Sequence, residues 1–125
     1  MKKVINITGV PAPIGPYSQA LLNNGMLYVS GQIPINPYTG LMVEGDITVH
    51  TRQVLENISA LLKEAGMNFS NVVKTSIFLA DMNDFAKVNQ IYSSYFSTNY
   101  PARETVQAAR LPKDSRIEIS VIAAI

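Results

Sequence analysis

Apolar residues recur along this chain with two different periods, and each period predicts a type of element. Near the N-terminus, residues 19–22 and 26–30 are predicted strands that flank Asn24-Gly25. This pair is typical of a hairpin turn because both residues tolerate positive φ. An earlier strand is expected before the proline-rich loop of residues 10–16. The chain is therefore expected to begin with three strands.

Helical spacing dominates the middle of the chain. Asp46 is expected to cap a helix that stops at Gly66, because apolar residues between them recur every three or four positions. Residues 72–80 then form a β-rich run that is long enough for a buried strand. A second helix is expected from about residue 81 to about residue 98. Tyr100-Pro101 ends it, since the residue before a proline avoids the helical region.

Two further strands are expected over residues 103–110 and 116–124, which gives the order β-β-β-α-β-α-β-β. This order predicts one α+β domain over residues 1–125, with two helices on one face of a mixed β-sheet. The opposite sheet face would then be bare. Charged residues form 15% of the chain, against about 25% in a typical soluble domain, so we expect a homo-oligomer that buries apolar surface.

Composition excludes several classes of site. The chain has no cysteine, so disulfides, thiolate metal sites and cysteine nucleophiles are ruled out. Its net charge is +1 with no basic stripe, which makes nucleic acid a poor default partner. No apolar run approaches the roughly 20 residues of a membrane helix. A cytoplasmic protein without a membrane partner is the simplest expectation.

Arg103 is the first candidate site residue. It follows Pro101-Ala102 at the mouth of a predicted strand, where period two places Thr105 and Gln107 on the same face. The planar guanidinium suits bidentate binding of a carboxylate. Its position alone is equally compatible with an ion pair between Arg103 and an acidic neighbour.

Glu118 is the second candidate, because it interrupts an apolar strand and carboxylates are rarely buried without a reason. Such a group could handle water or a proton. A gatekeeper on an edge strand, or a salt bridge, is the more common explanation for such a residue.

The remaining candidates are weaker individually. Asn89 shares a helical stripe with aromatic residues and could be an ordinary core amide. Tyr17 and Ser30-Gly31 lie where loops meet strands and could contact a ligand. His50 has no second histidine or cysteine with which to bind a metal, and we expect it at the surface or at a helix cap.

Five segments give the chain a specific resemblance over nearly its whole length. In order, they are Ile14-Gly15-Pro16-Tyr17-Ser18-Gln19, Val29-Ser30-Gly31-Gln32-Ile33-Pro34, residues 78–85, Pro101-Ala102-Arg103, and residues 109–114 followed by Ile117-Glu118-Ile119. In these segments the chain resembles the YjgF/RidA family of reactive-intermediate deaminases.

The resemblance implies a chorismate-mutase-like subunit in a homotrimer, with sites in the clefts between subunits. It implies hydrolysis of 2-imino acids such as 2-iminobutanoate and 2-iminopropanoate, or their enamines, to 2-oxo acids and ammonia, without a cofactor or a metal. Arg103 would hold the carboxylate and Glu118 would activate water. Tyr17, Ser30, Gly31, Asn89 and Thr105 would contact the substrate.

Thr105 is a departure, since many relatives carry cysteine there; a hydroxyl can still donate a hydrogen bond, but thiol chemistry is excluded. A second hypothesis is a regulatory trimer that binds 2-oxo acids without turnover. An RNA-cleaving factor is a third, disfavoured by the near-neutral charge and the single histidine.

Overall fold

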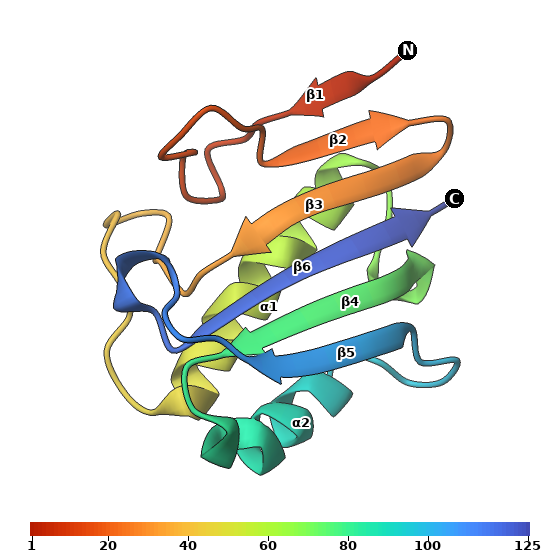
Figure 1. Cartoon of the computed structure of the whole chain (residues 1–125). Coiled ribbons are helices and arrows are strands. Elements are labelled where there is room, and N and C mark those ends of the chain that lie inside the picture. Colours follow the sequence, from red (N-terminus) through yellow and green to blue (C-terminus); the bar gives the residue numbers. More distant parts are fainter.

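The computed structural model describes all 125 residues as one mixed six-stranded sheet with two α-helices (Figure 1). The spatial strand order is β1-β2-β3-β6-β4-β5, and every pairing is antiparallel except β4 with β5. In chain order the elements are β1 (Lys3–Ile5), β2 (Ala20–Asn23), β3 (Met26–Gln32), α1 (Ile47–Glu64), β4 (Val72–Leu79), α2 (Phe85–Ser93), β5 (Ala102–Gln107) and β6 (Ile117–Ala124). The predicted order of elements is confirmed.

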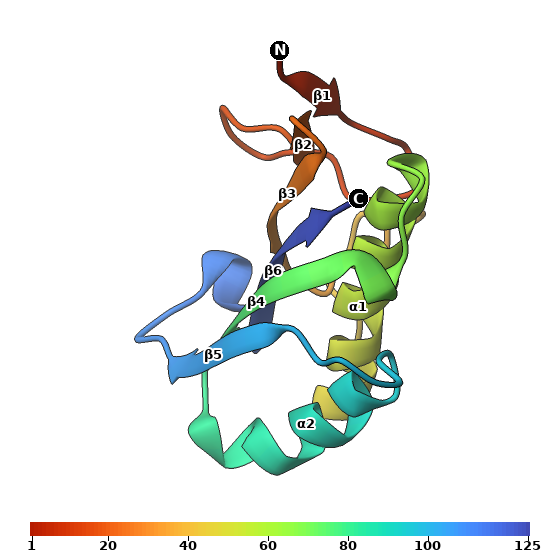
Figure 2. The ribbon, with the colours of Figure 1, turned by 90° about the vertical axis from the view of Figure 1, so that its right-hand side faces the viewer.

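Both helices cover the same face of the sheet (Figure 2). In β6, buried residues alternate with half-buried ones, because successive side chains point to opposite faces. The buried set, which includes Ile117 and Ile119, packs in one core with the apolar side of α1. Neither α-helix lies on the other face, and Tyr28 and Val106 there are 45% and 42% exposed. Neither helix is both long and apolar enough to cross a membrane.

Local signals in the sequence set the ends of several elements. The Asp46 carboxylate accepts hydrogen bonds from the backbone N–H groups of Thr48 and Val49, as a helix N-cap does. Gly66 has φ of 74° just after α1, and Gly25 has φ of 76° in the hairpin turn. These conformations favour glycine because it has no Cβ. The predicted cap, helix stop and hairpin are confirmed.

The second helix is shorter than expected. The prediction extended it to about residue 98, but α2 ends at Ser93. The hydroxyl groups of Ser93 and Ser94 donate to the carbonyl groups of Gln90 and Ile91. Serines compete in this way with the backbone ladder, and Asn99 then adopts φ of 52°. The serine hydroxyl groups, rather than the helical spacing of the aromatic residues, therefore set the C-terminal end of α2.

His50 is a second correction, because we expected it at the surface or at a helix cap. It lies on the buried side of α1 and is only 6% exposed. Its Nδ1 atom is buried without a hydrogen-bond partner. Burial, reinforced by the positive charge of Arg116, lowers the pKa of His50, while the Asp46 carboxylate opposes the shift. The folded protein therefore keeps this imidazole neutral.

This burial predicts a loss of stability in mild acid. As pH falls through about 6.5, the ordinary histidine pKa, the unfolded chain binds a proton that the folded chain does not, so the free energy of unfolding decreases. Urea unfolding at pH 7.5, 6.5 and 5.5 would measure the slope. We expect a shallower slope for His50→Gln, and an unchanged slope would contradict the assignment.

Candidate active site

Arg103 is held on the helix-covered face of the sheet by one side of α2. Its cross-strand partner in β4 is the buried Thr75. The Arg103 Nη1 atom donates to the Asn89 Oδ1 atom at 2.7 Å. The guanidinium carbon lies 5.0 Å from the ring centroid of Tyr92 and 5.6 Å from that of Phe85. Phe85, Asn89 and Tyr92 can share this task because positions i, i+4 and i+7 lie on one side of a helix.

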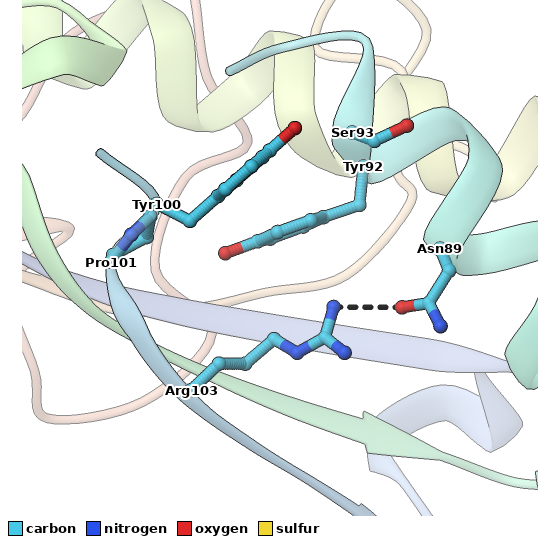
Figure 3. Close-up of a pocket in the computed structure, with 6 residues that line it drawn as sticks. All are labelled: Asn89, Tyr92, Ser93, Tyr100, Pro101 and Arg103. Carbon is cyan, nitrogen blue, oxygen red and sulfur yellow. Dashed lines mark hydrogen bonds between the residues drawn. The ribbon is translucent and has the colours of Figure 1, made fainter. Parts of the chain in front are cut away.

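The Tyr92 ring is itself firmly placed. Its hydroxyl forms a buried hydrogen bond of 2.9 Å with the Thr75 hydroxyl. Burial raises the pKa of Tyr92, so the phenol stays neutral beside the guanidinium. Figure 3 shows this ring between the Arg103 side chain and the Tyr100 ring. The cavity here has a volume of about 350 Å³ and is lined by Asn89, Tyr92, Ser93, Tyr100, Pro101 and Arg103.

The chain supplies no carboxylate to Arg103. The ion pairs of the subunit involve Lys74, Arg110 and Arg116, and Arg103 is held only by an amide and two aromatic rings. The salt-bridge alternative is therefore not realised within one subunit. Several guanidinium N–H groups stay free to bind an anion from outside the chain.

Glu118 lies in a separate cavity of about 330 Å³, lined by Ile14, Tyr17, Ser30, Gly31, Ile33, Pro112 and Glu118. β6, which carries Glu118, runs between β3 and β4, so the edge-strand explanation is wrong. The carboxylate forms no ion pair within the chain. Burial raises the pKa of Glu118, because the charged form loses hydration against apolar walls. This environment suits a carboxylate that exchanges protons.

Gly31 leaves the space that the Glu118 carboxylate occupies. A Cβ atom at position 31 would stand 2.7 Å from the Glu118 Cδ atom and 2.8 Å from its Oε2 atom. Contacts this short force a shift of the glutamate side chain. Gly31 is therefore a packing requirement of this cavity, which explains why a glycine follows Ser30 inside a strand.

We predict that Gly31→Ala displaces the carboxylate while the protein still folds. If Glu118 activates water as the resemblance implies, a displacement of about 1 Å can cost roughly 10²-fold in rate, and we expect a loss of that order in kcat. Steady-state kinetics and thermal melting would separate the two effects. Gly9→Ala is the matched control, because a Cβ there meets nothing within 4 Å. Equal activity of the two variants would refute the role of Gly31.

The two cavities open on opposite faces of one sheet. Arg103 is paired with Thr75, and Glu118 is paired with Phe78. Thr75 and Phe78 are three residues apart in the same strand, so their side chains point to opposite faces. One subunit therefore brings together Arg103 with Asn89, and Glu118 with Tyr17, Ser30 and Gly31. It does not bring Arg103 to Glu118.

Thr105 lies on the Arg103 face, as the strand period predicted, but it does not line the Arg103 cavity. Its Oγ1 atom is buried without a hydrogen-bond partner. The Ser30 hydroxyl is already used, since it donates to the Ser18 carbonyl group at 2.6 Å. Tyr92 and Tyr100 were not predicted as site residues; the aromatic stripe of α2 signalled Tyr92, while Tyr100 was noted only for its proline neighbour.

Comparisons with known proteins agree on one family. The profile of the family described as Endoribonuclease L-PSP matches residues 8–125. A RutC family protein of Pyrococcus horikoshii is 54% identical over 98% of both chains. The human 2-iminobutanoate/2-iminopropanoate deaminase is 49% identical over 98% of this chain and 90% of its own. A solved Rid-family structure from Yersinia pestis matches all of both chains with a TM-score of 0.97 and 52% identity. Sequence and fold together show that the chain belongs to the YjgF/RidA family.

Proposed function

We propose that this protein hydrolyses 2-imino acids, such as 2-iminobutanoate and 2-iminopropanoate, to 2-oxo acids and ammonia. The observation that carries the proposal is an arginine held by neutral groups and paired with no carboxylate of its own chain. It has the charge and geometry to bind the substrate carboxylate. About half of the residues are shared with relatives named 2-iminobutanoate/2-iminopropanoate deaminase, which supports this substrate class.

The proposed reaction begins with water adding to the imine carbon. Glu118 accepts a proton from the attacking water as the new C–O bond forms, and the imine nitrogen takes up a proton to give a carbinolamine. Glu118 then takes the proton of the carbinolamine hydroxyl as the C=O bond forms and the C–N bond breaks, and this proton passes to the departing nitrogen, which leaves as ammonia. The raised pKa of Glu118 favours both the addition of water and the loss of ammonia, because a more basic carboxylate accepts a proton more readily at neutral pH.

The substrate is proposed to bind between two subunits of a homotrimer. Arg103 and Glu118 face opposite sides of one sheet, so a small molecule that touches both needs a second chain. The open sheet face, with exposed Tyr28 and Val106, is the surface we propose for self-association. Arg103 and Asn89 would then come from one subunit. Glu118, Tyr17, Ser30 and Gly31 would come from its neighbour.

Imine hydrolysis fits this chain better than RNA cleavage does. General acid-base cleavage of RNA would draw on groups such as histidines, and the single histidine here is buried in α1 with a lowered pKa. A net charge of +1 offers little attraction for a phosphate backbone. Regulatory binding of a 2-oxo acid remains the competing function, and Glu118 distinguishes the two, because binding alone does not need a proton acceptor.

The direct test supplies the imine by a threonine dehydratase and traps it with semicarbazide. Wild-type protein is expected to lower semicarbazone formation in proportion to its concentration. A decay of the imine no faster than in buffer would refute the proposal. Tight 2-oxobutanoate binding without turnover would instead support the regulatory function.

A further inference from the structure

The side chain of Gln19 forms more hydrogen bonds than any other in the chain, although Gln19 lines neither the Arg103 cavity nor the Glu118 cavity. The side chain is buried, with only 2% of the residue exposed. Its Oε1 atom accepts from the backbone N–H of Ile7 at 2.6 Å. Its Nε2 atom donates to the carbonyl groups of Ile7 at 3.1 Å and Pro11 at 2.9 Å, with a longer contact of 3.4 Å to Val10. One amide at the end of the loop between β1 and β2 thus binds the first half of that loop.

This loop, residues 7–18, joins β1 to β2 and has little other means of holding its shape. Pro11, Pro13 and Pro16 have no backbone N–H, so a regular ladder cannot form across it. The Gln19 side chain supplies donors and an acceptor in place of that ladder. At the far end, the Ser18 carbonyl accepts from the Ser30 hydroxyl, and the backbone N–H of Ser30 donates to the Gln19 carbonyl at 2.9 Å.

The same loop forms one wall of the Glu118 cavity. Ile14 and Tyr17 line that cavity from the loop, together with Gly31 and Pro112 from other segments. The Tyr17 hydroxyl also accepts a 3.4 Å hydrogen bond from the backbone N–H of Ile14, which keeps the two wall residues together. Releasing the loop from Gln19 would therefore open the cavity over the carboxylate, although Gln19 does not touch it.

We propose that Gln19 is a positioning residue for catalysis, which holds the 7–18 loop closed over Glu118 and so controls the access of water to the carboxylate. This inference rests on the proposed deaminase function. In the closed arrangement the carboxylate faces apolar walls and accepts a proton efficiently. With the loop released, water hydrates the carboxylate and the pKa of Glu118 returns toward its ordinary value. Apart from Glu118, Tyr17 is the only titratable side chain that lines this cavity.

Two variants test the positioning role of Gln19, one that removes its side-chain hydrogen bonds and one that weakens its position more mildly. Gln19→Met keeps a similar length and removes all of the side-chain hydrogen bonds. Asn6→Ala is milder, because the exposed Asn6 Oδ1 atom accepts only the backbone N–H of Gln19 at 3.0 Å. This second variant keeps the test open if Gln19→Met does not fold. Asn71→Ala is the control, since the Asn71 amide also ties down a loop, but at Ala124, the far end of β6.

For Gln19→Met we expect kcat to fall about tenfold or more, because the catalytic group loses its fixed surroundings. The acid limb of the pH profile should move to lower pH, since a less shielded carboxylate stays ionised further into acid. Amide hydrogen exchange at Ile7 and Ser30 should accelerate. Asn6→Ala should move the same quantities in the same direction by less. Asn71→Ala should lower the melting temperature without moving the pH profile.

Faster exchange in the loop with unchanged kcat and pH profile in both variants would overturn the inference, because Gln19 would then be structural only. So would a shift of the acid limb in Asn71→Ala equal to that in Gln19→Met. A different result would refute the proposed function, namely a wild-type protein that does not accelerate imine decay.

Discussion

Replacing Arg103 with alanine is expected to lower kcat/KM for 2-iminobutanoate hydrolysis by roughly 10²-fold, or about 3 kcal/mol. The variant loses the only cation in its cavity, and with it the charge-assisted hydrogen bonds that we propose for the substrate carboxylate. Much of the loss should appear in KM, because an arginine that holds the substrate carboxylate would do so in the ground state as well as in the transition state. Part should appear in kcat, since the imine carbon also loses its orientation.

Two further variants make this result specific. Arg103→Lys keeps the charge but loses the planar fork between Asn89 and the aromatic rings, so its activity should lie between wild type and Arg103→Ala. Arg52→Ala removes an exposed arginine from α1 and should leave kcat/KM unchanged. Wild-type kinetics in Arg103→Ala would show that the substrate carboxylate binds elsewhere.

The order of elements could be predicted from sequence because it depends on local signals. The Asn24-Gly25 turn, the Asp46 cap and the Gly66 stop each act within a few residues, and the structure confirms all three. The predicted end of α2 was wrong because the serine hydroxyl groups and the apolar stripe indicate different boundaries. The predicted surface position of His50 was wrong for a related reason. A single polar residue in an apolar stripe can face either way, and only packing decides.

Several residues that line the two cavities could be named from the sequence, but their arrangement in space could not. Period two correctly placed Arg103 and Thr105 on one face of β5, because strand alternation is a local property. Which residues of β4 lie beside Arg103 and Glu118 depends on the register of β4 with β5 and with β6, which sequence patterns do not specify. The separation of Arg103 from Glu118 follows from that register. The contact of Gly31 with Glu118 likewise joins segments far apart in sequence.

Glu118→Gln is expected to lower kcat by about 10³-fold with little change in KM, since general acid-base catalysis contributes roughly 10²–10⁴-fold. The amide is nearly isosteric, so it should fit beside Gly31 and preserve the cavity, but it cannot accept the proton of water. This kinetic pattern differs from that of Arg103→Ala, which should raise KM. Retained kcat in Glu118→Gln would show that turnover does not depend on Glu118 as the proton acceptor.

Mixing these two weak variants tests how the site is assembled. If Arg103 and Glu118 act from neighbouring subunits, trimers reassembled from equal amounts of Arg103→Ala and Glu118→Gln regain about a quarter of the intact sites, by random pairing around the ring. If both residues act from one chain, no site is restored. Unfolding and refolding the mixture, with each variant treated alone as a control, gives the comparison. Recovery of activity in the mixture alone would follow from the opposite-face geometry, because no single subunit places the carboxylate anchor and the proton acceptor on one side of its sheet.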